Sequence, residues 1–549
     1  AYDLQALGNA EVYFELLGNR RESSQTGYRQ LSLDYARGSL LLPASLQTSL
    51  FQAPPTEISN GQPVAVRAFI GFGNDHSSQT VDFWKATGGL RGDFVWTDWR
   101  YDFMVSKARS DADYTFQSFL TDRVARSLDV VAAPGGGFAC RNAADGCVAA
   151  PFLTSQVIGG VLPENWKNYV FRPVTGNTLY EESTVNFAID GPLFSLPYGQ
   201  VRGAFGVEYR HSKIDDSPSV DAVNRNLFGL TSGDPTRGND SVKEIYGEVE
   251  VPVLSGLKGA EELIFNLSAR YTDYKSYGSD NTYKIGGLWT PVNWLTLRAS
   301  YGTSYRAPAL FEQFLGATSG FLPASNDPCN NYGADPDASV ALAANCASEG
   351  LPGNFNATSS ITSIGLGGAA QGLKAETSKN FTTGIVLQPE FSKNFGDLSF
   401  AVDYYKIEVE NGVAEQSSKL FDGDPVRDVN GNVGSPSMSA TLDTTYDWKN
   451  WKIRYGLEWI DSTQSYGYYG LDRETSPFKM HTEDYYLSNV SAQYKLDKWT
   501  FTGGVRNVFD AEPKTISQSG VYNRVGNAPL YSGYDYVGRS FFLNVQAKF

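Results

Sequence analysis

The chain has no apolar segment long enough for a transmembrane helix and few residues of the kinds that carry metal or catalytic chemistry. A helix crosses a bilayer with roughly 18–20 consecutive apolar residues, and no window of the sequence contains such a run. The histidines, His76, His211 and His481, stand apart from one another, without an HExxH or comparable metal-binding spacing. A G-x-S-x-G nucleophile motif and a phosphate-binding loop are missing as well. We therefore expect a protein that is not an enzyme, in which these histidines are ordinary surface or lumen residues.

Positive charge is also scarce, because 45 Lys and Arg residues face 60 Asp and Glu residues and leave a formal net charge of −15. Proteins that bind nucleic acids need a basic stripe or patch to neutralise phosphates. No cluster of basic residues in the sequence overrides the acidic total. We therefore expect no nucleic-acid partner.

The chain has only 4 cysteines, and they form two local pairs, Cys140 with Cys147 and Cys329 with Cys346. Both pairs lie in stretches rich in Gly, Ala, Asn and Pro, without the CxxC spacing or neighbouring His of a zinc site. Short-range pairs in loops predict disulfides and hence an oxidising compartment. Four unrelated reduced thiols are the alternative.

Aromatic residues and glycines are abundant, with 32 Tyr, 32 Phe and 55 Gly, as is typical of strands and turns. Mean hydropathy is −0.31, which suits a soluble protein. It also suits strands that alternate lipid-facing apolar and lumen-facing polar residues. The last strand has this alternation, with Phe541, Leu543, Val545, Ala547 and Phe549 on one face. It resembles the C-terminal insertion signal of bacterial outer-membrane β-barrels.

The same alternation predicts about nineteen strands along the chain. The first six are expected at 11–23, 27–39, 64–73, 80–91, 94–106 and 112–123, the first two as a hairpin. From residue 124 on, compact connections alternate with mostly much longer ones, of which the longest are 124–181, 213–241, 306–377, 411–436, 464–483 and 508–537. Short turns on one side and long loops on the other are what a transmembrane β-barrel requires. The sequence therefore predicts an all-β fold, a large transmembrane antiparallel β-barrel over residues 1–549 with these segments as extracellular loops.

Three segments resemble, in order, the signatures of TonB-dependent outer-membrane receptors. They are 300–314 with Tyr305, Arg306, Ala307, Pro308 and Glu312, 372–389 with Leu373, Glu376, Ser378 and Gly384, and 503–513 with Asn507, Phe509 and Asp510. The Asp-Pro-Cys at 327–329, followed by a second cysteine, is similar to loops in large receptors of sphingomonad- and caulobacter-like bacteria. The resemblance extends with lower specificity over nearly the whole chain.

This resemblance implies a 22-stranded barrel in the outer membrane of a Gram-negative bacterium, embedded in lipid and lipopolysaccharide. It implies energised import of a scarce ligand of the siderophore, vitamin or oligosaccharide class. Energy would come from the TonB-ExbB-ExbD complex through a plug domain and a TonB box. Neither is recognisable in this chain, so we expect them in an N-terminal part of the receptor outside it. An odd count of nineteen strands would place the start of the chain outside the cell, after the third strand of the barrel.

One segment offers candidate ligand contacts. Tyr466, Tyr468 and Tyr469 alternate with Gly in a predicted outer loop, where flat tyrosine faces could stack on sugars or aromatic chelates. The alternative is that they belong to the aromatic belt at the outer membrane interface.

A second segment has the spacing of oxygen ligands for a hard cation such as calcium. Its members are Asp422, Asp424, Asp428, Asn430 and Asn432. The alternative is a turn cluster of Asp, Asn and Gly without a metal. No other cofactor is expected.

Two further functions remain open at this point. A passive porin-like channel would have an inward-folded constriction loop with opposed rows of charge and would need no plug. A secreted β-sandwich adhesin or glycan-binding protein would be soluble without detergent, and the rhythm of short and long connections counts against it.

Overall fold

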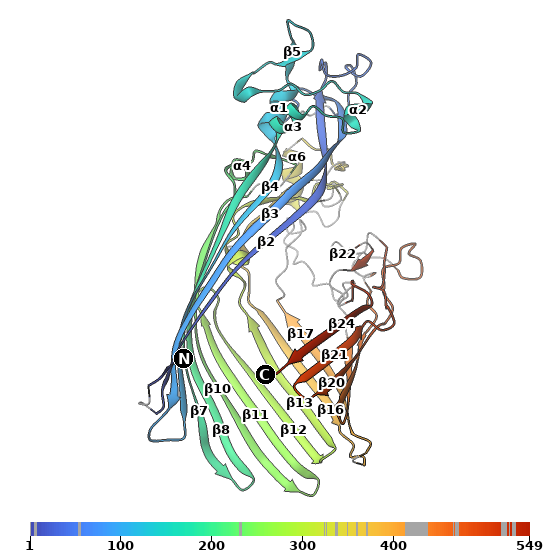
Figure 1. Cartoon of the computed structure of the whole chain (residues 1–549). Helices are drawn as coiled ribbons and strands as arrows, with labels where there is room; N and C mark the ends of the chain where they lie inside the picture. The colour runs from blue at the N-terminus through green and yellow to red at the C-terminus, as the bar shows by residue number, and fades with distance from the viewer. Residues whose placement is uncertain are drawn as a thin grey trace.

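The computed structural model describes residues 2–548 apart from the following positions: 5–7, 53–55, 57, 230–232, 323, 325–326, 335–338, 349, 358–360, 369–371, 393, 412–437, 465, 467–471, 518–523, 526 and 530–533. Figure 1 labels its elements. Among the described residues, no helix is long and apolar enough to cross a membrane.

Eighteen strands of the described residues form one antiparallel sheet. They are β1 (Tyr2–Asp3), β2 (Glu11–Ala36), β3 (Val64–Asp93), β4 (Arg100–Leu120), β7 (Phe171–Leu196), β8 (Gly199–Ser217), β9 (Leu227–Phe228), β10 (Thr236–Leu257), β11 (Ala260–Tyr274), β12 (Gly278–Val292), β13 (Leu295–Arg306), β16 (Glu376–Leu387), β17 (Asp397–Glu410), β18 (Ser439–Trp448), β19 (Trp451–Ile460), β20 (Tyr485–Leu496), β21 (Trp499–Arg506) and β24 (Ser540–Ala547). β1 and β9 have two residues each, which leaves sixteen long strands, and each long strand pairs with the next one along the chain. The prediction of an all-β fold built on one large antiparallel sheet is confirmed.

The connections carry small elements of their own. They are α1 (Thr121–Leu128), β5 (Val130–Ala132), β6 (Phe138–Cys140), η1 (Ala144–Gly146), α2 (Ser155–Ile158), α3 (Glu164–Val170), α4 (Val220–Val223), α5 (Leu310–Phe314), β14 (Thr318–Leu322), α6 (Val340–Ser348), β15 (Ile361–Gly365), β22 (Arg524–Val525) and β23 (Ala528–Pro529). The strands among them pair as β5 with β6, β14 with β15 and β22 with β23.

The predicted count of nineteen strands is wrong, because the first six predicted segments form only three strands. Strand β2 runs through 11–23 and most of 27–39 without a turn. Strand β3 contains 64–73 and 80–91, and β4 contains most of 94–106 and 112–123. The polar residues that suggested turns, such as Gln25 and Asp111, are paired in register with Ser77 and Asp82. A strand that leaves a bilayer has water on both faces, so its apolar alternation stops while its pairing continues.

The sheet has a short-turn edge and a long-connection edge. Connections at the short-turn edge include 94–99, 197–198, 258–259, 293–294, 449–450 and 497–498. Tyr2 pairs with Val12 near this edge, and the Lys548 N–H donates to the Lys498 carbonyl in one of its turns. An even number of long strands thus brings both ends of the described chain to one edge. The reason for placing the start of the chain at the opposite edge is therefore removed.

The outer face of the wall is apolar and uncovered. Phe187, Val207, Ile245 and Tyr271 lie side by side on β7, β8, β10 and β11, and each is 39–57% exposed. The next positions along these strands, such as Glu244, point to the opposite, inner face. Among the described residues no pairing joins β24 to β2, and Figure 1 shows a curved wall with these strands at its two sides. An exposed apolar surface of this size marks a contact with lipid or with another protein.

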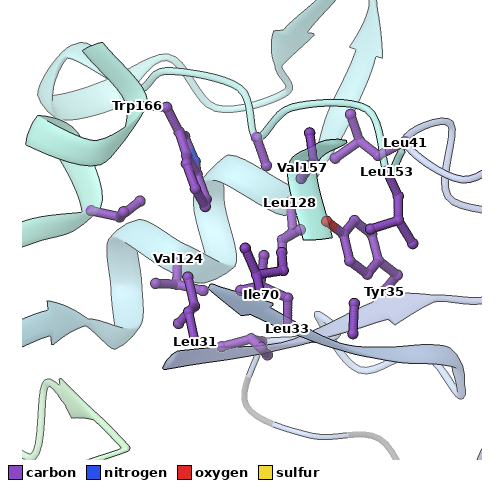
Figure 2. Packing of buried hydrophobic residues seen from close by; sticks show 14 of the residues in the cluster. Leu31, Leu33, Tyr35, Leu41, Ile70, Val124, Leu128, Leu153, Val157 and Trp166 are labelled. Atoms are coloured by element: carbon purple, nitrogen blue, oxygen red, sulfur yellow. The ribbon is translucent and has the colours of Figure 1, made fainter. Parts of the chain in front are cut away.

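β2, β3, β4 and β7 extend beyond their neighbours and carry a folded lobe, here called the head, which contains α1, α2 and α3 (Figure 1). Its core includes Tyr35, Ile70, Val124 and Trp166, each at most 1% exposed (Figure 2). Burying each such side chain stabilises the fold by about 1.5–3 kcal/mol. The segment 124–181, expected as an irregular loop, is therefore largely part of a compact unit. Its helices are too short to show a helical period in the sequence.

Candidate ligand-receiving surface

The first two family signatures meet at the long-connection edge, where β13 ends and β16 begins. Arg306 ends β13 and is paired in register with Glu376, the first residue of β16. The Arg306 guanidinium lies 2.7 Å from Glu312 Oε1 and 3.3 Å from Glu376 Oε2. Glu312 Oε2 also accepts a 2.6 Å hydrogen bond from the Ala309 N–H, so its carboxylate caps α5. Two signatures distant in sequence thus form one ion-paired cluster that directs the chain as it leaves the sheet.

Beyond this cluster, α5 folds back over the inner face of β10. The Phe314 ring covers Gly238 so closely that a Cβ built there would lie 2.0 Å from a ring carbon. Gln313 is only 3% exposed, and its Nε2 donates to the Pro308 carbonyl at 2.6 Å and approaches Asp240 Oδ2 at 3.5 Å. The connection after β13 therefore begins as an anchored segment on the inner wall.

Glycines on the inner wall let side chains reach across a strand. Arg298 of β13 donates to Asp403 of β17 at 2.9 Å across Gly384 of the intervening β16. A Cβ at Gly384 would lie 1.9 Å from Asp403 Oδ1, so the second signature contains glycine where this ion pair crosses. The Tyr246 ring covers Gly206 in the same way. The inner face of the wall is thus polar, and its side chains form contacts across intervening strands, in contrast to the apolar outer face.

The third signature ends β21 and positions β24. Asn507 is fully buried with a left-handed backbone (φ 51°), and its side-chain amide exchanges two hydrogen bonds with the backbone of Ala511. Asp510 Oδ1 accepts a 2.8 Å hydrogen bond from the Arg539 N–H, just before β24 begins. Phe509 is 74% exposed. In this structure Asn507 and Asp510 organise a connection and do not present a ligand site.

A hollow of about 630 Å³ opens on the inner wall around β18–β21 and β24. It is lined by Asp443 and Arg454, whose side chains are 2.7 Å apart, and by Arg506, whose guanidinium lies 5.6 Å from the Phe542 ring centre. Tyr534 of the connection before β24 also lines the hollow. Charged and aromatic groups of this kind can bind a polar ligand of small-molecule size.

The three candidate tyrosines are only partly covered by the structure. Tyr466 is 6% exposed, and its hydroxyl contacts the Phe478 carbonyl, the Met480 N–H and His481 Nδ1 at 3.0–3.2 Å. Its ring belongs to the packing of its own loop. Tyr468 and Tyr469 lie outside the described residues, and so do the calcium candidates Asp422, Asp424, Asp428, Asn430 and Asn432. Within the described part of the chain, no group of His, Cys, Asp or Glu side chains could hold a metal.

Both predicted cysteine pairs are disulfides in the structure. Cys140 is bonded to Cys147 in the head, and Cys329 is bonded to Cys346 of α6 in the connection between β13 and β16. In the terminal strand, Phe541, Leu543 and Val545 are 49–76% exposed on one face, while Phe549 lies outside the described residues.

Sequence reasoning missed Asp240 and Gln313, which meet from positions 73 residues apart. Neither belongs to a motif that we could recognise, and Gln313 merely follows Glu312 of the first signature. No signal in a single sequence would have joined them.

Residues 16–435 match the family model described as TonB dependent receptor-like, beta-barrel. Heme/hemopexin utilization protein C of Haemophilus influenzae (strain 86-028NP) is 26% identical over 141 residues, which are 24% of this chain and 19% of that protein. The match thus spans about a fifth of the length of this curated relative.

Among solved structures, the siderophore receptor PirA from Acinetobacter baumannii is 13% identical with a TM-score of 0.44, and the match covers 99% of this chain and 72% of that one. A variant of the ferric enterobactin receptor PfeA from Pseudomonas aeruginosa is 14% identical with a TM-score of 0.41, with coverage of 100% and 79%. Because the family model matches most of the sequence, this chain belongs to the TonB-dependent receptor-like β-barrel family.

Proposed function

We propose that the chain forms the wall of an outer-membrane receptor that binds a scarce small molecule at its long-connection edge and imports it by TonB-driven transport. One observation carries this proposal: the wall strands present an apolar outer row and a polar inner row, as at Ile245 and Glu244 of β10. Lipid would cover the first row, and the ligand's path would follow the second.

We further propose that a plug-containing part of the receptor fills the space inside the wall and passes energy from the TonB-ExbB-ExbD complex. A barrel closed from a wall of sixteen long strands would enclose a space too wide for its own side chains to fill. The charged inner pairs, such as Arg270 with Glu244 at 3.0 Å, offer hydrogen-bonding partners to such a domain. The long-connection edge of the wall would face the cell exterior.

An iron complex such as haem is the first ligand to test, because the curated relatives are named for heme/hemopexin utilization. Vitamins and oligosaccharides remain as further classes. Stacking by Tyr468 and Tyr469, and calcium binding by the segment from Asp422 to Asn432, also stay proposals. Unchanged calcium-dependent melting after replacement of Asp428 and Asn430 by Ala would remove the calcium proposal.

Uptake of labelled ligand tests the transport proposal. Cells that carry the receptor should accumulate haem iron when TonB is present and lose this uptake when it is deleted. Planar-bilayer recording with the complete receptor should show no steady open conductance. Equal uptake without TonB, together with a large constant conductance, would instead identify a passive channel.

A further inference from the structure

Positively charged side chains border the apolar rows of the outer face on the side of the long-connection edge. On β10, Ile245 belongs to the exposed apolar row, and Lys243 is two positions nearer this edge on the same face. Strands β8 and β4 show the same change from apolar to basic residues beyond Val207 and Val105. The side chains concerned, here called the rim cluster, are Lys107, Arg109, His211, Lys213 and Lys243.

Strand pairing brings the rim cluster together from distant parts of the sequence. Lys107, Ser183 and His211 are successive members of one row across β4, β7 and β8, so Lys107 and His211 lie about 10 Å apart at the usual strand spacing. Lys213 follows His211 on the same face of β8 at about 7 Å. Lys243 lies diagonally from His211 on β10, at about 7–8 Å. An anion above Ser183 and His211 is therefore within reach of long lysine side chains from three strands.

Carboxylates neutralise one part of the rim cluster. Arg109 is paired with Asp111 at 2.9 Å, and Lys107 Nζ lies 3.8 Å from Glu181 Oε1. Both of these carboxylates are on the outer face with their partners. The Arg109 guanidinium in particular is committed to an ion pair within β4.

Lys213 and Lys243 have no such partner among the described residues. Glu181 is paired in register with Lys213, and Asp273 with Lys243, but neither carboxylate forms an ion pair with that lysine. Both lysines are exposed. An anion at the membrane surface can therefore approach them without breaking an existing ion pair, and charge-assisted hydrogen bonds to phosphate are among the strong ones.

Strand β16 offers a contrast on the same face of the wall. Lys379 stands two positions beyond the exposed Phe381, as Lys243 stands beyond Ile245. Its Nζ, however, lies 2.8 Å from Glu410 Oε1 of β17. The same place relative to the apolar rows thus carries a neutralised lysine on β16 and a free one on β10.

We propose that the rim cluster binds the phosphorylated head group of an outer-leaflet lipid, lipopolysaccharide in the proposed setting, with Lys213 and Lys243 as its main contacts. The acyl chains of this lipid would lie on the apolar rows that begin directly below, at Val207 and Ile245. Charge complementarity and this continuity with the apolar rows select the occupant, because a soluble anion would use the first feature and leave the second unused. The site rests on the outer-membrane location in the proposed function.

Lipid binding can be measured on the full chain in a neutral detergent that contains no phosphate. Diphosphoryl lipid A is titrated, with native mass spectrometry as the readout, and the same lipid without its phosphates serves as the uncharged analogue. Lipid A should bind saturably, and the dephosphorylated form should bind at least about tenfold more weakly. Replacing Lys213 and Lys243 together by Ala should weaken lipid A binding by about 25-fold, since each lysine near an anionic head group contributes about fivefold. Replacing both by Arg should preserve binding.

Lys379→Ala is the matched control, because its ammonium is already paired with Glu410, and its affinity for lipid A should equal that of the wild type. Inorganic phosphate at the same concentrations should not displace the lipid. The site is refuted if the dephosphorylated lipid binds equally, if the double Ala variant binds as well as the wild type, or if Lys379→Ala weakens binding as much. Displacement by inorganic phosphate would instead identify a site for a soluble anion. Because the assay needs no TonB, loss of uptake with lipid binding intact would refute the transport proposal alone.

Discussion

At the residue scale, the family signatures in this chain are mostly structural contacts. Asn507 shows this most clearly, because its backbone is left-handed, its side chain is fully buried, and its N–H donates to Asn489 Oδ1 at 3.0 Å. Such a position needs a residue that tolerates this backbone and can also form hydrogen bonds.

We expect Asn507→Ala to destabilise the folded chain by about 2–4 kcal/mol. It leaves the N–H and carbonyl of Ala511 without their hydrogen-bond partner, and it places an alanine in the left-handed backbone conformation at 507. Asn507→Gly keeps only the first defect, so it should be about 1 kcal/mol less damaging. Urea unfolding in detergent micelles measures both variants. Equal losses for Ala and Gly would mean that the left-handed backbone contributes nothing.

His481 predicts a pH dependence. Its pKa lies below the ordinary value of 6.5, first because of burial and then because of Arg473 and Lys479, while Glu483 acts in the opposite direction. The folded state therefore binds this proton less readily than the unfolded state. The stability from the neutral imidazole is complete above pH 6.5 and is lost as pH falls through the lower folded pKa.

The melting temperature of the wild type should accordingly drop more steeply below this pH than that of His481→Gln, which stays neutral throughout. If the melting temperatures of the two proteins fall equally with pH across the acid range, His481 is not the cause of the pH dependence.

At the element scale, strands were predictable and small helices were not. Period-2 alternation located the long strands from β7 on, because each of them separates outward-facing apolar from inward-facing polar residues, as in Phe205 and Glu208 of β8. The short strands β9, β14, β15, β22 and β23 lie in segments that were expected to be loops. The turns assigned within β2, β3 and β4 were wrong, since polar residues such as Gln25 continue the pairing beyond the apolar band. The α5 site depends on contacts between distant segments, such as Gln313 with Asp240, which no local pattern specifies.

The packing of α5 on β10 can be tested by substituting Gly238. Gly238→Ala should displace the Phe314 ring and cost about 1–3 kcal/mol by overpacking. Hydrogen exchange should accelerate at Gly316, whose N–H donates to Thr236 Oγ1 at 3.0 Å, and stay slow in the sheet. Gly286→Ala is the matched control, because its new Cβ would meet nothing closer than 3.8 Å. Equal exchange in both variants would mean that Gly238 does not hold α5 in place.

The head should behave as a separate unit of stability. Replacing Cys140 and Cys147 by Ser removes a disulfide between residues 7 positions apart. In the chain-entropy model, such a disulfide stabilises the folded state by about 2–3 kcal/mol, so the head should lose this amount. Hydrogen exchange should rise in the neighbourhood of α1 and remain unchanged in β10–β13. The corresponding change at Cys329 and Cys346 should leave the head as it was. Loss of protection throughout the sheet would contradict this separation.

At the scale of the whole molecule, a wall that spans the outer membrane predicts opposite accessibility of its short-turn edge and its long-connection edge. All four cysteines are in disulfides, so single added cysteines can be labelled selectively. In intact cells, a membrane-impermeant maleimide should label Val220→Cys in α4 and leave Lys258→Cys, in a short turn, unlabelled until the cells are broken. Labelling of both sites in intact cells would contradict the proposed orientation.

The unequal strand lengths determine how far the head stands from the rest of the wall. A tilted strand needs about 9–11 residues to cross a bilayer, whereas β3 has 30. In the proposed setting roughly twenty residues of β3 would project from the membrane, and at about 3.3 Å per residue they form a hydrogen-bonded ribbon some 60 Å long, which is paired with β2 throughout and with β4 only from Ser78 on. In the proposed setting, that ribbon would hold the head well beyond the lipid headgroups, so molecules in the surrounding medium could reach it without touching the bilayer.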